Sequence, residues 1–207
     1  TYLNGQSPFA LIITCSDSRV IPEVIFQQGI GDLFVVRVAG NVVDEFVLGS
    51  IEYAIEHLNI TCVVVLGHKN CGAVSSCLNH ASGRYVNKLI ERISQNIKNE
   101  KDYDKAIELN VKAEVLNLKQ AFATFKNVEF IGSIYDPYSG QTLYWPHPRR
   151  NTQYLTTHRR CSTSRPDFPG TLPQSSHWLQ SGSDSFLPKI RSAACSYLRQ
   201  LNLSQEY

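Results

Sequence analysis

The sequence contains no methionine and only 2 tryptophans among its 207 residues. It also has little charge: Asp, Glu, Lys and Arg make up 18% of the chain, and the formal net charge is +2. These values exclude a strongly basic nucleic-acid binder and an acidic disordered chain. Hydrophobic residues make up 43%, which is enough for a sizeable core. We therefore expect one globular domain of ordinary size, with room for an appendage.

Long apolar runs and a secretion signal are also missing. No stretch approaches the roughly 20 apolar residues that a membrane span needs, and the first residues lack the charged-then-apolar layout of a signal peptide. We expect no membrane association and a cytoplasmic location; the alternative is an organellar or exported protein that has lost its targeting segment. Because the chain opens on Thr1 where a complete reading frame has Met, we expect a processed chain or a fragment.

Cysteine is too scarce for a disulfide scaffold, with 6 residues unevenly spread along the chain. Cys62 and Cys77 lie in a predicted strand and a predicted helix, so we interpret both as packing residues. Cys161 and Cys195 lie near the C-terminus and could pair with each other, although nothing in the sequence supports that geometry. The remaining two cysteines have neighbours that suggest chemistry.

Charge and composition divide the chain in two. Residues 1–145 carry 12 basic and 15 acidic residues, whereas residues 146–207 carry 8 basic and 3 acidic residues and six of the 9 prolines. We expect a folded domain over 1–145 and a basic, Ser/Pro-rich, weakly ordered tail over 146–207. The tail has no aromatic residues clustered beside its arginines, so we expect no nucleic-acid partner.

The domain shows the pattern of an α/β fold. Short apolar runs rich in β-branched residues predict buried strands over 9–14, 33–38, 61–66 and 128–135. Helical periodicity follows over 44–57 and as one long stretch over 85–125, where charged residues such as Glu114 are expected on solvated faces. Strands that alternate with helices favour a central, mostly parallel sheet flanked by helices. A turn over 136–140 then allows a final hairpin strand over 141–145.

Three potential metal ligands follow two of these strands. Cys15 comes directly after the first strand, and His68 and Cys71 follow the third. Because ligands gather beyond the carboxyl ends of parallel strands, these side chains can meet. Two thiolates and an imidazole suit Zn²⁺ and leave a fourth position for a reactant. Each residue alone would be better explained as part of the core, but the three together favour a metal site.

Asp17 and Arg19 stand two and four residues beyond the first cysteine. A guanidinium can hold a carboxylate in one orientation through two parallel hydrogen bonds. A carboxylate fixed beside a metal can accept a hydrogen bond from a reactant there. An ordinary loop salt bridge is the alternative, but it would not explain the placement beside a candidate ligand.

These motifs resemble those of the β-class carbonic anhydrases. The resemblance covers roughly residues 6–145 and depends on the pairing of Cys15-Ser16-Asp17-Ser18-Arg19 with Gly67-His68-Lys69-Asn70-Cys71-Gly72. It implies zinc bound by Cys15, His68 and Cys71, with Asp17 and Arg19 as a catalytic pair. Further site residues that the resemblance implies bind substrate or line its pocket: Gln6, Phe34, Ala39, Tyr53 and Gly72.

The resemblance also implies the activity and the assembly. The reaction is the reversible hydration of carbon dioxide to bicarbonate and a proton by zinc-bound hydroxide, in a homodimer or higher oligomer whose partner subunit completes the pocket. Ile12 stands where members with a regulatory bicarbonate site have Trp, so we expect the subgroup without that site. The chain begins only fourteen residues before Cys15, so the helical arm that usually wraps the partner is expected to be missing.

Two other functions stay open. Relatives in the same superfamily hydrolyse carbon disulfide or carbonyl sulfide at a similar site, and the sequence does not reveal the shape of the access channel. A zinc-stabilised module without catalysis is the other alternative. For the leading hypothesis, two thiolates would cancel the charge of Zn²⁺, so we expect activity to rise toward alkaline pH. His57 and His80 are expected to be surface helix residues.

Overall fold

The protein is described by a computed structural model, which covers residues 5–145 together with residues 195 and 198. The elements follow in the order β1 (Ala10–Thr14), α1 (Pro22–Ile25), β2 (Leu33–Arg37), the 3₁₀ turn η2 (Ala39–Asn41), α2 (Glu45–Leu58), β3 (Cys62–His68), α3 (Gly72–Leu78), α4 (Val86–Ile97), α5 (Tyr103–Ala121), β4 (Glu129–Tyr135) and β5 (Thr142–Trp145). The predicted α/β fold is confirmed. Within the described residues, no helix is long and apolar enough to cross a membrane.

The five strands form one mixed sheet in the order β2-β1-β3-β4-β5. The first four are parallel to their neighbours, and β5 pairs antiparallel with β4, as the predicted hairpin requires. Thr14, the last residue of β1, stands beside Leu66 of β3. β3 continues for two more residues to His68, so the residues that follow β1 and the end of β3 meet at the same edge of the sheet.

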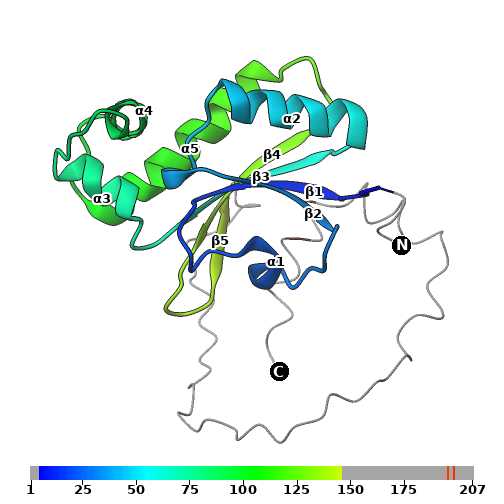
Figure 1. The fold of residues 1–207 in the computed structure, drawn as a ribbon, viewed down its shortest axis with the longest axis horizontal. Coiled ribbons are helices and arrows are strands. Elements are labelled where there is room, and N and C mark those ends of the chain that lie inside the picture. The colour runs from blue at the N-terminus through cyan, green and yellow to red at the C-terminus, as the bar shows by residue number, and fades with distance from the viewer. Residues whose placement is uncertain (1–4, 146–194, 196–197, 199–207) are drawn as a thin grey trace, which may run out of the picture.

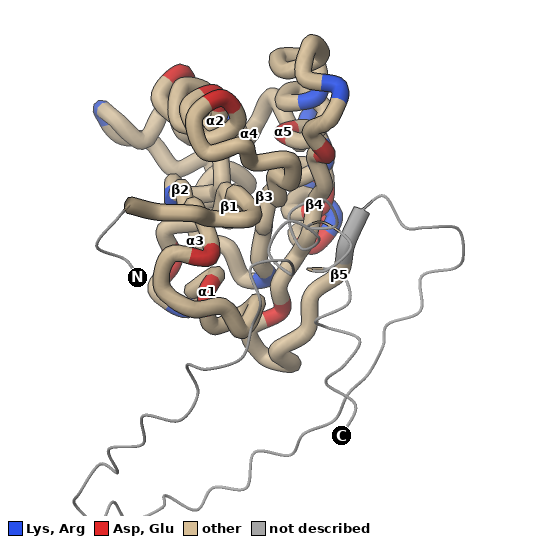
Figure 2. The backbone as a smooth tube through the Cα atoms, turned by 90° about the vertical axis from the view of Figure 1, so that its right-hand side faces the viewer, with Lys and Arg blue, Asp and Glu red and all other residues tan. Residues whose placement is uncertain are grey.

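Helices cover the two faces of the sheet unequally (Figures 1 and 2). α2 and α5 pack on one face, with α4 against α5, and alternate strand residues such as Leu11, Val63 and Phe130 belong to the larger core cluster there. The other face is covered by α1 together with residues 195 and 198, over a smaller cluster that includes Ile12 and Val64. This alternation explains why the strands are apolar along their whole length.

The predicted long helix over 85–125 is wrong in one respect, because it is two helices. α4 ends at Ile97, and the residue that follows, Lys98, has a positive φ of 56°, which does not continue the helix. The Glu100 carboxylate then accepts hydrogen bonds from the backbone N–H groups of Lys101 and Asp102, and the Asp102 side chain caps α5 by accepting from Lys105 N at 2.9 Å. Glu114 was expected on a solvated face, but its side chain is fully buried between α4 and α5.

The cysteine predictions are also corrected. Cys62 at the start of β3 forms a disulfide with Cys195, 133 residues further along the chain, so it is not a simple packing residue and Cys195 does not pair with Cys161. Cys195 and Leu198 are both buried under the sheet. The remainder of the predicted tail lies outside the described residues. Cys77 is free and buried, as expected of a packing residue.

Candidate metal centre

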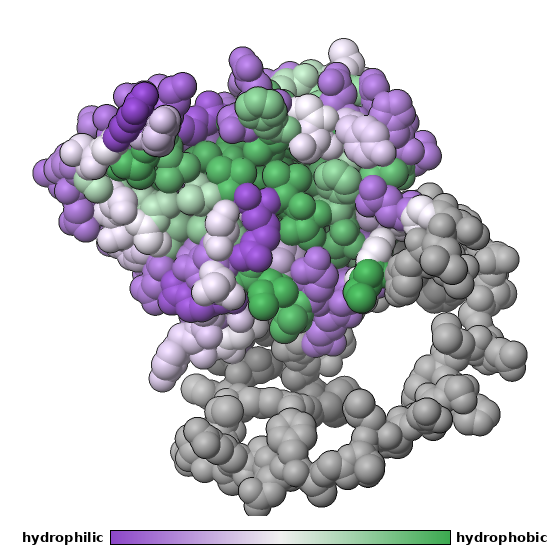
Figure 3. Space-filling model, viewed as in Figure 1, coloured by the Kyte–Doolittle hydropathy of each residue, from purple (hydrophilic) through white to green (hydrophobic). Residues whose placement is uncertain are grey.

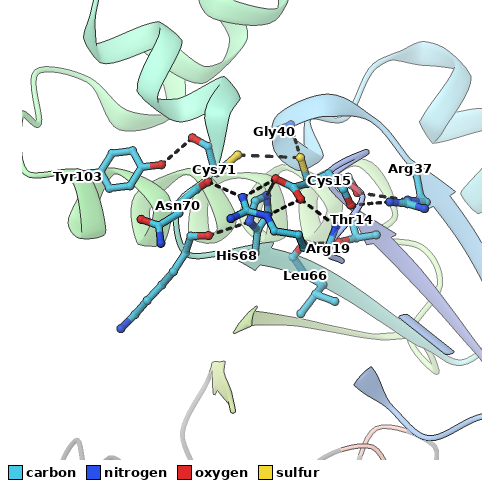
Figure 4. A network of polar contacts seen from close by, with 12 residues as sticks. Thr14, Cys15, Arg19, Arg37, Gly40, Leu66, His68, Asn70, Cys71 and Tyr103 are labelled. Atoms are coloured by element: carbon cyan, nitrogen blue, oxygen red, sulfur yellow. Dashed lines mark hydrogen bonds and ion pairs between the residues drawn. The ribbon is translucent and has the colours of Figure 1, made fainter. Parts of the chain in front are cut away.

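The candidate ligands Cys15, His68 and Cys71 meet at the edge of the sheet where β1 and β3 end (Figure 4). Their ligand atoms lie within 4.8 Å of one another, and all three residues are buried. The Thr14 hydroxyl donates to Leu66 O at 2.9 Å and so ties the two strands together directly below the cluster. The predicted convergence of these three residues is therefore present.

The two sulfur atoms lie 4.0 Å apart, at the limit of a hydrogen bond between a thiol and the other sulfur. The Cys71 thiol stabilises a thiolate at Cys15 and so lowers the pKa of Cys15, although burial opposes the shift. The same contact and burial raise the pKa of Cys71. The backbone N–H of Gly40 also points at the sulfur of Cys15, at 3.3 Å. These contacts favour the thiolate form of Cys15, and a bound cation would favour the thiolate form of both cysteines.

His68 presents one ring nitrogen for binding. Its Nδ1 lies 2.9 Å from Lys69 O, a group that can only accept, so Nδ1 carries the hydrogen and Nε2 carries the lone pair. The ring is fully buried, and Nε2 has no hydrogen-bond partner among the described residues. A buried, unpartnered nitrogen beside two sulfur atoms is a costly arrangement unless it binds a cation. The residues present therefore fit Zn²⁺, which prefers nitrogen and sulfur ligands.

Asp17 and Arg19 form the predicted fork beside these ligands. Arg19 donates from Nε to Asp17 Oδ1 at 2.9 Å and from Nη2 to Oδ2 at 2.7 Å, and its backbone N–H reaches Oδ1 at 3.0 Å. The Arg19 guanidinium holds the pKa of the Asp17 carboxyl well below its usual range. Asp17 Oδ2 lies 3.9 Å from Nε2 of His68, so the carboxylate faces the candidate metal position.

The remaining predicted site residues are less closely gathered. Gln6 lies in the exposed segment before β1, and Gly72 is the exposed first residue of α3. Ala39 opens η2, next to the glycine that contacts Cys15. The rings of Phe34 on β2 and Tyr53 on α2 lie 6.4 Å apart, and Tyr53 is partly exposed. Their roles in substrate binding stay predictions.

Several residues that hold the site were not predicted as site residues. Arg37 donates to the backbone oxygens of Cys15 and Asp17, at 3.3 and 2.7 Å, and the Tyr103 hydroxyl donates to Cys71 O at 2.7 Å. Tyr103 begins α5, 32 residues after Cys71, and nothing in its sequence context indicates this contact. Arg37 ends β2, and its side chain donates to backbone atoms, which a sequence motif does not reveal.

Comparison with known proteins decides the family. The family model described as carbonic anhydrase matches residues 10–142, well over half of the chain. The chain belongs to the carbonic anhydrase family. A curated relative, carbonic anhydrase from Pseudomonas aeruginosa, is 35% identical over 163 residues, which cover 66% of this chain and 72% of the relative. Carbonic anhydrase 2 of Mycobacterium tuberculosis is 51% identical over 98 residues, which cover 45% of this chain and 47% of the relative.

Solved structures place the chain in the β-class of this family. The Coccomyxa β-carbonic anhydrase in complex with acetazolamide has a TM-score of 0.60 and 31% identity, over 68% of this chain and 73% of that one. One of the tetrameric β-carbonic anhydrases from Sordaria macrospora has a TM-score of 0.60 and 28% identity, over 70% and 83% of the chains. The chain spans about half the length of the mycobacterial relatives that it matches.

Proposed function

We propose that the chain catalyses the reversible hydration of carbon dioxide to bicarbonate and a proton at a zinc ion held by Cys15, His68 and Cys71. The observation that carries the proposal is the buried Nε2 of His68, which has no hydrogen-bond partner among the described residues and lies close to two cysteine sulfurs. Membership of the carbonic anhydrase family supports the same reaction. When bound, the zinc ion would acidify water, so that a nucleophile for carbon dioxide is present near neutral pH.

Asp17 supplies a hydrogen-bond acceptor for the reactant. Its two oxygens have four lone-pair sites, and Arg19 occupies two at Oδ1 and one at Oδ2. One lone-pair site on Oδ2 therefore accepts no hydrogen bond from the described residues, and this oxygen is the one that faces His68. Because Arg19 keeps the carboxylate ionised, Asp17 accepts a hydrogen bond from the attacking group and fixes its orientation.

Arg19 also links the two loops that build the site. Its Nη2 donates to Asn70 O at 3.0 Å, next to Cys71, while the same nitrogen holds Asp17 next to Cys15. A non-catalytic zinc module would need neither this fork nor the carboxylate, so the pair favours an enzyme. No observation favours carbon disulfide or carbonyl sulfide as the substrate.

We propose that two copies of the chain associate through the face that carries α2 and the edge strand β2. Figure 3 shows a broad hydrophobic area in the middle of this face. Phe46 on α2 is 87% exposed and Tyr53 is 47% exposed, so aromatic surface adjoins this area, and exposed apolar patches mark interaction sites. The tetrameric state of a structural neighbour supports an oligomer. Phe34 and Tyr53 would then line a pocket that the partner completes.

The disulfide bears on the location of the protein. Disulfides form and persist in oxidising compartments, so the bond between Cys62 and Cys195 supports the organellar or exported alternative over the cytoplasm. The location stays a prediction.

The function is tested by measuring bound zinc and stopped-flow hydration of carbon dioxide on the purified chain. We expect one zinc per chain, loss of zinc and activity in Cys15→Ser, and retained zinc with at least about 10-fold lower activity in Asp17→Asn. Asp17→Asn is the matched variant because it keeps the shape of the side chain. Stoichiometric zinc without hydration of carbon dioxide would refute the proposed activity. Parallel assays with carbon disulfide and carbonyl sulfide test the alternative substrates.

A further inference from the structure

Four polar side chains form a continuous chain of hydrogen bonds behind the metal centre, between α4 and α5. Arg92 and Asn96 stand one turn apart on α4, and Asn110 and Glu114 stand one turn apart on α5. Arg92 holds Glu114 through Nε to Oε1 at 2.8 Å and Nη2 to Oε2 at 2.6 Å. Asn96 Nδ2 donates both to Glu114 Oε1 at 2.7 Å and to Asn110 Oδ1 at 2.9 Å.

The chain of hydrogen bonds ends at the turn that contacts a metal ligand. Asn110 Nδ2 donates to Gly40 O at 2.8 Å, and Gly40 N donates to the sulfur of Cys15 at 3.3 Å. Gly40 has a left-handed backbone with φ 68°. A Cβ at this position would lie 2.8 Å from Cδ1 of Ile93 on α4, so the turn lies directly against the helix pair. Figure 4 shows the Gly40 turn beside the sulfur of Cys15.

We propose that Asn110 is a positioning residue of the metal centre. By holding the Gly40 carbonyl, it keeps the neighbouring N–H of Gly40 directed at the sulfur of Cys15. A hydrogen bond to a thiolate ligand orients the ligand and adjusts how strongly it donates to the cation, which is how groups outside the ligand set tune metal sites. The inference rests on the proposed zinc site, but not on the reaction that takes place there.

The orientation of the Asn110 amide is fixed from both ends. Its oxygen faces the Asn96 donor and its nitrogen faces the Gly40 acceptor. Reversing the amide would place its oxygen against the Gly40 carbonyl oxygen and its nitrogen against Nδ2 of Asn96. Glu114 in turn holds Asn96, and Arg92, whose side chain is 31% exposed, links the buried groups to the surface. Asn110 itself is only 1% exposed, so water does not compete for the Gly40 carbonyl.

A purely structural role is the alternative, in which the network only joins α4 to α5. Buried ion pairs are weak evidence for such a role, because apolar residues of similar volume often stabilise a protein equally well. The Asn110 bond also reaches past the helix pair, since its acceptor is the Gly40 carbonyl in η2. The two explanations differ in what they predict for the metal, because only positioning connects Asn110 to the electronic environment of Cys15.

The test compares Asn110→Leu with Leu118→Ala. Asn110→Leu keeps a similar volume and removes the donor to Gly40, whereas Leu118 is a fully buried residue eight positions further along α5. Zinc-free protein is loaded with Co²⁺ to record the thiolate-to-cobalt charge-transfer band. Zinc affinity is measured by competition with a chromogenic chelator, and stability by urea unfolding.

We expect Asn110→Leu to shift the cobalt band and to weaken zinc binding about 10-fold or more. Leu118→Ala should unfold more easily and leave both metal readouts unchanged. Equal changes of the cobalt band and of the zinc affinity in the two variants, or no change in Asn110→Leu, would overturn the inference. Neither result would contradict the zinc site itself. Failure of the unmodified chain to bind either metal would overturn the site itself and the inference with it. If Asn110→Leu does not fold, Asn110→Ala gives the same comparison.

Discussion

The close contact between β3 and α5 gives a prediction whose size follows from the structure. A Cβ added at Gly67 would lie 2.5 Å from Cγ2 of Val111. Real Cβ atoms essentially never lie closer than 3.0 Å to such a neighbour. Neither group is at the end of a flexible chain, so β3 and α5 must move apart. Overpacking of a core in this way costs about 1–3 kcal/mol. We therefore expect Gly67→Ala to lower the free energy of unfolding by that amount and to weaken zinc binding, because His68 follows directly.

A double-mutant cycle isolates the contact. Val111→Ala alone should cost about 1–3 kcal/mol, from lost burial and the cavity that it leaves. In the double variant the new methyl group enters that space, so the two losses should fall short of additivity by about 1–2 kcal/mol. Gly72→Ala is the matched control: nothing lies within 4 Å of its added Cβ, and it stands at the start of α3, so it should be neutral or slightly stabilising.

The assay is urea unfolding followed by circular dichroism, with metal and redox conditions held constant. A Gly67→Ala variant within about 0.5 kcal/mol of the unmodified chain, a span typical of surface substitutions, would refute the reasoning. Strictly additive losses would do the same, because they would show that the two side chains do not meet.

Three further predictions concern the fork, the disulfide and the exposed face. Replacing Arg19 by Leu should raise the pKa of Asp17 toward the usual carboxyl range, as measured by NMR titration of the zinc-free protein. In the unmodified chain the lowered pKa stabilises the fold at pH values above the pKa of the unfolded carboxyl. The difference in stability between the unmodified chain and the Arg19→Leu variant should therefore shrink as the pH falls into the acid range. Non-reducing peptide mapping should recover Cys62 joined to Cys195. Because the bond closes a long loop in the unfolded chain, Cys62→Ser should lower the free energy of unfolding by up to about 5 kcal/mol. An unchanged melting temperature would contradict a stabilising disulfide. Phe46→Glu should shift the chain toward monomer in analytical ultracentrifugation, and an unaltered oligomer would place the interface elsewhere.

The strands could be predicted from the sequence because each is buried on both faces and is therefore apolar throughout. The break between α4 and α5 could not. Residues 98–102 are polar and fit the solvated face of a continuous helix. The break depends on the positive φ of Lys98 and on the Glu100 carboxylate, which accepts hydrogen bonds from the backbone of the next two residues. α1 was missed because four residues are too few to show a period.

The ligand cluster could be predicted because its residues are chemically distinctive and follow strand ends. The polar network behind it could not. Glu114 and Asn110 occupy helix positions where charged and amide residues are normally solvated, and only the packing of α4 shows that both are buried. The partner of Cys62 was equally hidden, since the connectivity of cysteines far apart in sequence depends on the three-dimensional path of the chain.

The unequal cover of the sheet has a consequence for how the protein is made. A nascent chain leaves the ribosome N-terminus first and folds as it appears. The helices over one face lie between or beside the strands in sequence, so that layer can assemble as soon as β4 has emerged. The opposite face gains only the four residues of α1 at that stage, and Leu198 arrives 63 residues after the end of β4. Among the described residues, Cys195 and Leu198 are the last to join the cluster on this face of β1 and β3, so this part of the core closes late in synthesis.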